Sequence, residues 1–114
     1  MRVMKEMRLL PRPKERKIPM EALHTEATDR LFDAILRLKT REECYALFDD
    51  LCTIREVRDL SQRFEVAGML RDGCSYQEIS QKTGASTATI CRVNKCLLYG
   101  TGGYRQALLE EEDK

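Results

Sequence analysis

Residues 75–99 read SYQEISQKTGASTATICRVNKCLLY, a stretch with two helix starts and one glycine turn. Ser75 and Glu78 have the spacing of a capping box, in which each side chain bonds to the other residue's backbone N–H at the start of a helix. Gly84 suits the end of that short helix, and Ser86 is a favoured N-cap for a second one. Two helices joined by a tight turn predict a helix-turn-helix over about residues 75–99.

The second helix of this motif is expected to bury one face and expose the other. Ile90, Val93 and Leu97 recur at helical spacing and are predicted to face the core. No Asp or Glu occurs between residues 83 and 108. Five residues are expected to point outward: Thr87, Ala88, Cys91, Arg92 and Lys95.

These outward residue types suit the major groove of DNA. Arg92 can pair with a guanine edge, and Ala88 is small enough to meet a thymine methyl group. Thr87 and Thr89 offer hydroxyls to bases, whereas Lys95 is better placed for a phosphate. The alternative is an ordinary helical hairpin with a solvated basic face.

The rest of the chain predicts further helices and no strands. Apolar residues recur at steps of three and four over residues 26–39, a segment apolar enough to face both its own core and a partner. Thr40 with Glu43, and Thr53 with Glu56, mark two more capping boxes. The helix after the second box is expected to turn five residues inward: Val57, Leu60, Phe64, Ala67 and Leu70.

Glycines mark the ends of these helices. Gly73 is expected to close the long helix as a left-handed cap. The glycines from Gly100 to Gly103 separate the helix-turn-helix from a last amphipathic segment, residues 104–112. The predicted fold class is therefore all-α.

Charge is unevenly distributed along the 114 residues, although the net charge is only +1. Residues 1–20 carry a net charge of +5 and all three prolines. We therefore interpret residues 1–24 as a basic, flexible arm and residues 25–112 as one helical DNA-binding domain. The arm is either a disordered tail or a segment that contacts DNA phosphates.

The five cysteines and single histidine argue against metal binding and catalysis. Cys91 and Cys96 are five residues apart, about 140° around a helix, so they diverge. His24 is the only histidine, and no base is placed beside a cysteine nucleophile. We expect the protein to be neither an enzyme nor a metal-binding protein. Structural thiols are the preferred interpretation, with redox sensing at Cys91 as the alternative.

No apolar run could span a membrane, and no secretory signal is recognisable. An odd number of cysteines without such a signal points to a reducing compartment. The predicted location is the cytoplasm.

The run GASTATICR, from Gly84 to Arg92, resembles the Gly-Ala-x-x-Ala-Thr-Ile-x-Arg signature of Trp-repressor helix-turn-helices. Further matches are ECY at 43–45, FDDLCTI at 48–54 and QR at 62–63. On these residues, the chain from Leu31 to Leu108 is similar to the small Trp-repressor-like family of the YerC/YecD type.

The resemblance implies a bundle of about six helices and an intertwined homodimer on double-stranded DNA. Each subunit would place the second helix of its motif in the major groove, at a two-fold symmetric operator. Ser75 and Tyr76 would lie near phosphates. The predicted DNA-binding residues are Ser75, Tyr76, Ser86, Thr87, Ala88, Thr89, Cys91, Arg92 and Lys95.

The resemblance also implies a possible effector pocket. Arg92 matches an arginine that lies against the bound tryptophan in Trp repressor. Arg63 matches a second arginine of that pocket, and Gln62 matches the same position equally well. Val93 stands where that repressor has a glycine, and Cys96 where it has a serine. Because the branched Val93 side chain fills the space that a ring needs, we do not expect tryptophan. No cofactor is expected, although another small-molecule effector stays open.

The sequence therefore predicts a dimeric transcriptional regulator, with repression by promoter occlusion as the expected mechanism. The resemblance implies genes of amino-acid biosynthesis, histidine in particular, as targets. Two alternatives remain. One is the DNA-binding subunit of a transposition or replication-initiation system, and the other is a helical adaptor that binds a protein and no DNA.

Overall fold

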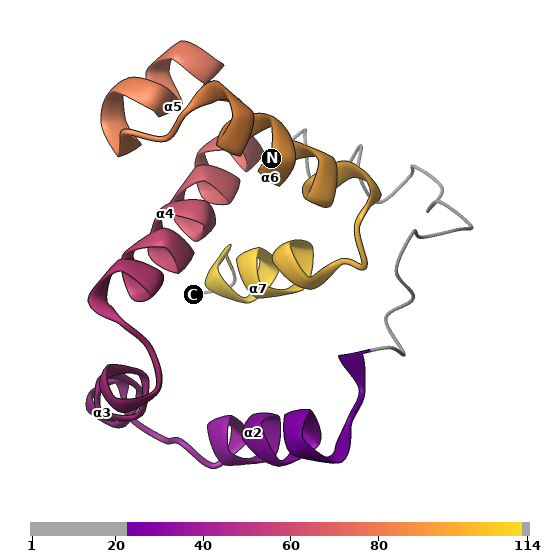
Figure 1. Ribbon diagram of the computed structural model, residues 1–114. Helices are drawn as coiled ribbons and strands as arrows, with labels where there is room; N and C mark the ends of the chain where they lie inside the picture. Colours follow the sequence, from indigo (N-terminus) through magenta and orange to yellow (C-terminus); the bar gives the residue numbers. More distant parts are fainter. Residues whose placement is uncertain (1–22, 113–114) are drawn as a thin grey trace. The chain divides into compact units, whose positions relative to one another are not determined.

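The computed structural model describes residues 23–112, which form helices joined by short connections and contain no strand (Figure 1). The all-α prediction is confirmed. The arm expected over residues 1–24 lies almost wholly outside the described part. The helices are α2 (Glu26–Leu36), α3 (Arg41–Leu51), α4 (Ile54–Arg71), α5 (Tyr76–Thr83), α6 (Thr87–Tyr99) and α7 (Gly103–Glu112).

Helices α3 and α4 begin at the two capping boxes that the sequence predicts. The Thr40 hydroxyl accepts the Glu43 N–H at 3.1 Å, while the Glu43 carboxylate accepts the Thr40 N–H at 3.3 Å. Thr53 and Glu56 exchange the same pair of bonds, at 3.1 and 2.8 Å. Each box satisfies backbone donors that a helix start leaves without a partner.

Helix α2 ends earlier than its apolar periodicity predicts. It stops at Leu36, although the pattern extends to residue 39. The N–H of Arg37 bonds to the Ala34 carbonyl, and the N–H of Leu38 bonds to the Ile35 carbonyl. These bonds span three residues instead of four, so the last turn tightens and the helix stops.

The described chain falls into two compact units, residues 23–57 and residues 58–112. No residue between 23 and 57 is buried. The second unit contains a continuous apolar core to which α4, α5, α6 and α7 all contribute. Its buried residues are Val66, Ala67, Leu70, Ile79, Ala85, Ile90, Val93, Leu97 and Leu108.

The prediction for the inward face of α4 is partly wrong. Ala67 and Leu70 are buried as expected, but Leu60 and Phe64 stay 46% and 38% exposed. Val66, which the pattern missed, is fully buried. Helical periodicity identifies apolar faces, but it does not specify which neighbour covers each face, and the core of this unit contacts the face centred nearer Val66.

Two glycines adopt the left-handed backbone expected of them. Gly73 has a φ of 86° and follows α4, and the N–H of Cys74 reaches back to the Met69 carbonyl at 3.0 Å. Gly84 has a φ of 78° and ends α5. Because L-residues avoid this region, glycine lets each helix stop abruptly and the chain turn at once.

Gly84→Ala is expected to lower the free energy of unfolding by about 1–2 kcal/mol, the cost of a left-handed non-glycine residue. A Cβ at Gly84 would meet nothing within 4 Å, so only the backbone conformation is penalised. Gly103→Ala is the matched control, since its Cβ is equally unobstructed and its φ is not positive. Urea unfolding at one protein concentration measures both. Equal effects would contradict the role given to Gly84.

Candidate nucleic-acid interface

Helices α5 and α6 form the predicted helix-turn-helix. The buried side of α6 consists of Ile90, Val93 and Leu97, as expected, and α5 contributes Ile79. Ala85, in the turn, is only 2% exposed. Because these side chains share one core with α4, the two helices are fixed against a third instead of only against each other.

The turn between α5 and α6 is held by three hydrogen bonds. The Thr83 hydroxyl donates to the Ile79 carbonyl at 2.8 Å and accepts the Ala85 N–H at 3.1 Å. The side-chain amide of Gln62, on α4, donates to the Thr83 carbonyl at 3.1 Å. The last turn of α5 is thus tied both to the connection and to α4, which fixes where α6 begins.

The outer face of α6 carries the residues predicted to read DNA. Thr87, Ala88, Cys91, Arg92 and Lys95 are all exposed. At about 100° per residue, Ala88 and Lys95 lie opposite the buried side, while Cys91 and Arg92 lie on either flank of them. The helix therefore presents a basic surface with a small residue at its centre.

The serines and Thr89 of the predicted DNA-binding set also have structural tasks. The Ser86 hydroxyl accepts the Thr89 N–H at 3.1 Å, and the two hydroxyls lie 3.2 Å apart. Ser75 and Glu78 form a complete capping box at the start of α5. Thr89 is only half-exposed, in contrast to Tyr76, which is exposed. If the serine hydroxyls contact DNA, they do so while they also accept hydrogen bonds at the starts of α5 and α6.

The residues expected to line an effector pocket divide into two groups. Val93 is 1% exposed and belongs to the core. Arg63 on α4, and Arg92 and Cys96 on α6, all interact electrostatically with the hydroxyl of Tyr104 on α7. Gln62, the alternative to Arg63 at this position, instead donates a hydrogen bond to Thr83, the last residue of α5.

Tyr104 is a site residue that the sequence analysis missed. Its ring centroid lies 6.5 Å from that of Phe64, with the planes tilted by 30°. Burial raises the pKa of its hydroxyl above the ordinary value, Cys96 raises it further, and Arg63 and Arg92 oppose the shift. The hydroxyl is therefore uncharged at neutral pH. Its spacing of four residues from Leu108 could have revealed a shared inward face.

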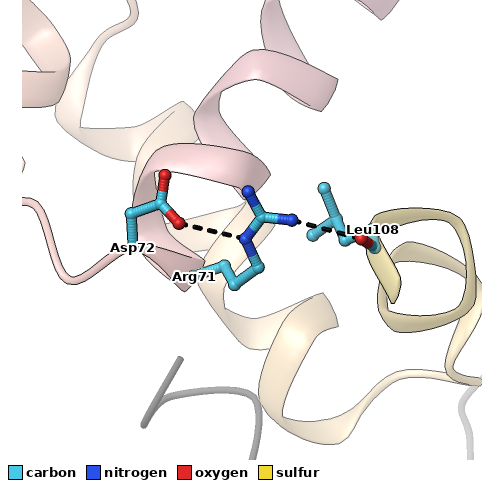
Figure 2. Close-up of polar contacts among 3 residues, drawn as sticks. All are labelled: Arg71, Asp72 and Leu108. Atoms are coloured by element: carbon cyan, nitrogen blue, oxygen red, sulfur yellow. Dashed lines mark hydrogen bonds and ion pairs between the residues drawn. The ribbon is translucent and has the colours of Figure 1, made fainter. Parts of the chain in front are cut away.

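Arg71 of α4 holds α7 at Leu108, one helical turn after Tyr104. Its Nη1 donates to the Leu108 carbonyl at 3.2 Å, and its Nε donates to a carboxylate oxygen of Asp72 at 3.1 Å (Figure 2). The Arg71 side chain is 12% exposed, so this ion pair is largely shielded on the arginine side. Helix α7 is thereby attached to the end of α4.

The part of the chain that the structure describes has neither a candidate metal site nor a candidate membrane span. Within residues 23–112, no three His, Cys, Asp or Glu side chains gather as metal ligands would, and no helix has the length and hydropathy to cross a membrane. All five cysteines are free thiols, and Cys91 and Cys96 are exposed.

An all-α chain with a capped helix-turn-helix and a basic outer helix face belongs to the class of small helix-turn-helix proteins. Residues 26–112 match the sequence pattern of the Trp repressor protein family, and the chain belongs to that family. It is 55% identical over 89 residues to the uncharacterised protein YerC of Bacillus subtilis (strain 168), covering 78% of this chain and 86% of YerC.

Two solved structures have the same fold. A Staphylococcus aureus protein crystallised as a candidate Trp repressor is 48% identical with a TM-score of 0.80, over 86% of this chain and 98% of that one. A TrpR-like protein from Eubacterium eligens ATCC 27750 is 52% identical with a TM-score of 0.79, over 81% and 95%. The resemblance inferred from the Gly84–Arg92 signature is thus confirmed.

Ser86→Ala is expected to lower the free energy of unfolding by about 1 kcal/mol, because the Thr89 N–H loses its acceptor. Ser86→Asp is the matched control. Aspartate caps as well as serine and interacts favourably with the positive end of the helix dipole, so stability should be retained. Chemical denaturation of both variants tests this, and an alanine variant as stable as the wild type would refute the capping role.

Proposed function

We propose that this protein is a sequence-specific DNA-binding transcriptional regulator that represses by occupying promoter DNA. The observation that carries the proposal is the division of α6 into a fully buried side and a basic exposed side. A recognition helix must be fixed on one side and present donors on the other if it is to distinguish base pairs. Membership of the Trp repressor family supports the same function.

Electrostatics favour a nucleic acid as the partner of this surface. The segment from residue 83 to 108 contains Arg92, Lys95 and Arg105 but no carboxylate. Helices α5 and α6 begin after the exposed N-cap residues Ser75 and Ser86. The first turn of a helix leaves backbone N–H groups without intrahelical partners, and such groups suit phosphate oxygens. A surface made for an acidic protein would also be basic, so dependence on base sequence distinguishes the two partners.

We further propose that the functional form is a homodimer. In residues 23–57, large apolar side chains lie on the surface of the single chain, among them Leu36 at 81% exposed and Tyr45 and Ile54 at 69%. Helices of 11 residues without buried side chains have little stability of their own, so this apolar surface needs a cover. A second copy supplies one and pairs two recognition helices, which suits a two-fold symmetric operator.

The proposed partner also gives the proposed location. A chromosomal DNA-binding protein of a bacterium acts in the cytoplasm, and the relatives named above come from bacteria. The link to amino-acid biosynthesis, and to histidine biosynthesis in particular, stays a prediction from the family resemblance. The genes next to the preferred DNA site decide it.

The test of the proposed function begins with selection of duplexes from a random library by the purified full chain. On the enriched duplex, Arg92→Ala should cost about 1–3 kcal/mol and relax the preference at one base pair. Lys95→Ala should weaken binding to all duplexes alike and reduce the salt slope by about one. Fluorescence anisotropy over a salt series measures both.

A third variant, Ser86→Asp, retains the helix cap but places a carboxylate at the start of α6, so it separates a loss of DNA binding from a loss of stability. It should weaken binding to every duplex without loss of stability. If Arg92→Ala weakens binding with no change in base preference, Arg92 does not read a base. If no duplex is enriched, either without ligand or with pooled amino acids added, the proposed function fails, and a protein-binding adaptor is favoured.

Leu36→Gln is expected to raise the dimer dissociation constant by about tenfold or more, because each subunit loses part of the 1.5–3 kcal/mol or so that a buried leucine contributes. Lys39→Gln, at an exposed polar position nearby, should change little. Sedimentation equilibrium reports both, with the wild type at twice the 13.2 kDa chain mass. A wild type that sediments as a single chain would contradict the dimer.

A further inference from the structure

Within the second unit, helix α7 is held in place by a row of contacts that begins at Tyr104. Tyr104 and Leu108 are four residues apart and share a face of the helix. Leu108 is 1% exposed, and its carbonyl is held by Arg71 of α4 (Figure 2). The position of the Tyr104 ring is therefore fixed from the far end of this row as well as by its own neighbours.

The neighbours of Tyr104 come from both α4 and α6. Phe64 and Arg63 belong to α4, whereas Arg92 and Cys96 belong to α6. The tyrosine also packs against the apolar core beneath. Because the ring packs against a core to which both α4 and α6 contribute, it limits how far α6 can shift relative to α4. This matters because the exposed side of α6 carries the proposed reading residues.

We propose that Tyr104 is a built-in positioning residue that locks the recognition helix α6 against α4, so that DNA binding requires no small-molecule effector. The inference rests on the proposed function and deepens it. Three of the four residues expected to line an effector pocket interact with this tyrosine, and the fourth, Val93, lies in the core. A side chain of the protein itself thus supplies an aromatic ring against the core that α4 and α6 share.

The uncharged state of the hydroxyl agrees with this role. A tyrosine hydroxyl with its ordinary pKa of about 10 is already a neutral phenol at neutral pH, and burial raises that pKa further, so the side chain adds no negative charge beside Arg63 and Arg92. The aromatic ring, and not the hydroxyl, packs against the apolar core that α4 and α6 share. The conservative variant Tyr104→Phe should therefore bind DNA nearly as well as the wild type.

The experiment compares binding of the enriched duplex by the full-length wild type, Tyr104→Ala, Tyr104→Phe and Tyr99→Ala. Tyr99 is the matched control, because it is a 51% exposed tyrosine at the end of α6. Tyr104→Ala should lose about tenfold or more in affinity, because fewer molecules hold α6 in the binding position. Adding p-cresol, the detached tyrosine side chain, should restore most of the loss and leave the wild type unchanged.

Amide hydrogen exchange of the free proteins gives a second readout that does not depend on DNA. Tyr104→Ala should exchange faster along residues 87–99 than the wild type, and p-cresol should slow that exchange again. Unchanged exchange in Tyr104→Ala would overturn the proposal, even if no duplex were ever enriched. So would unchanged DNA affinity in this variant, or a wild type that binds DNA only when pooled amino acids are added.

Discussion

The structure of the second unit depends on one apolar contact, that of α4 with the helix-turn-helix. Val66, Ala67 and Leu70 share a core with Ile79 of α5 and with the buried side of α6. Each large aliphatic side chain buried there contributes roughly 1.5–3 kcal/mol. Without this core, α5 would be an isolated helix of eight residues, far shorter than helices that persist alone in water.

The same contact divides α6 into two surfaces with separate tasks. Once Ile90, Val93 and Leu97 are buried, helical geometry fixes Ala88 and Lys95 on the opposite side. The residues on the flanks then have mixed roles. Arg92 lies beside the outer face, but its charge also lowers the pKa of the Tyr104 hydroxyl on α7.

Local sequence signals predicted most of the second unit. Capping boxes at Ser75 and Thr53, and glycines at 73 and 84, act through bonds and φ angles within a few residues, so they can be recognised without the fold. The buried face of α6 followed from periodicity for the same reason. The match to the Trp repressor family extends over residues 26–112 and so includes the segment that carries these signals.

Features that depend on tertiary contacts were less predictable. Periodicity could not tell that Val66 is covered while Leu60 stays exposed, because both lie on apolar faces of α4. Tyr104 was missed because its neighbours are far away in the sequence, at residues 63–64 and 92–96. The roles of Arg63 and Gln62 likewise became distinct only from the hydrogen bond that Gln62 donates to Thr83, the last residue of α5.

The most direct test of the account is methylation of purines in the enriched duplex, with and without the protein and with no ligand added. Dimethyl sulfate modifies guanine N7 in the major groove and adenine N3 in the minor groove. The account predicts protection of guanines in two major-groove segments related by two-fold symmetry, with centres about 10 base pairs or a multiple of that apart. Protection confined to adenines, or to a single segment, would contradict the placement of two α6 helices in successive major grooves.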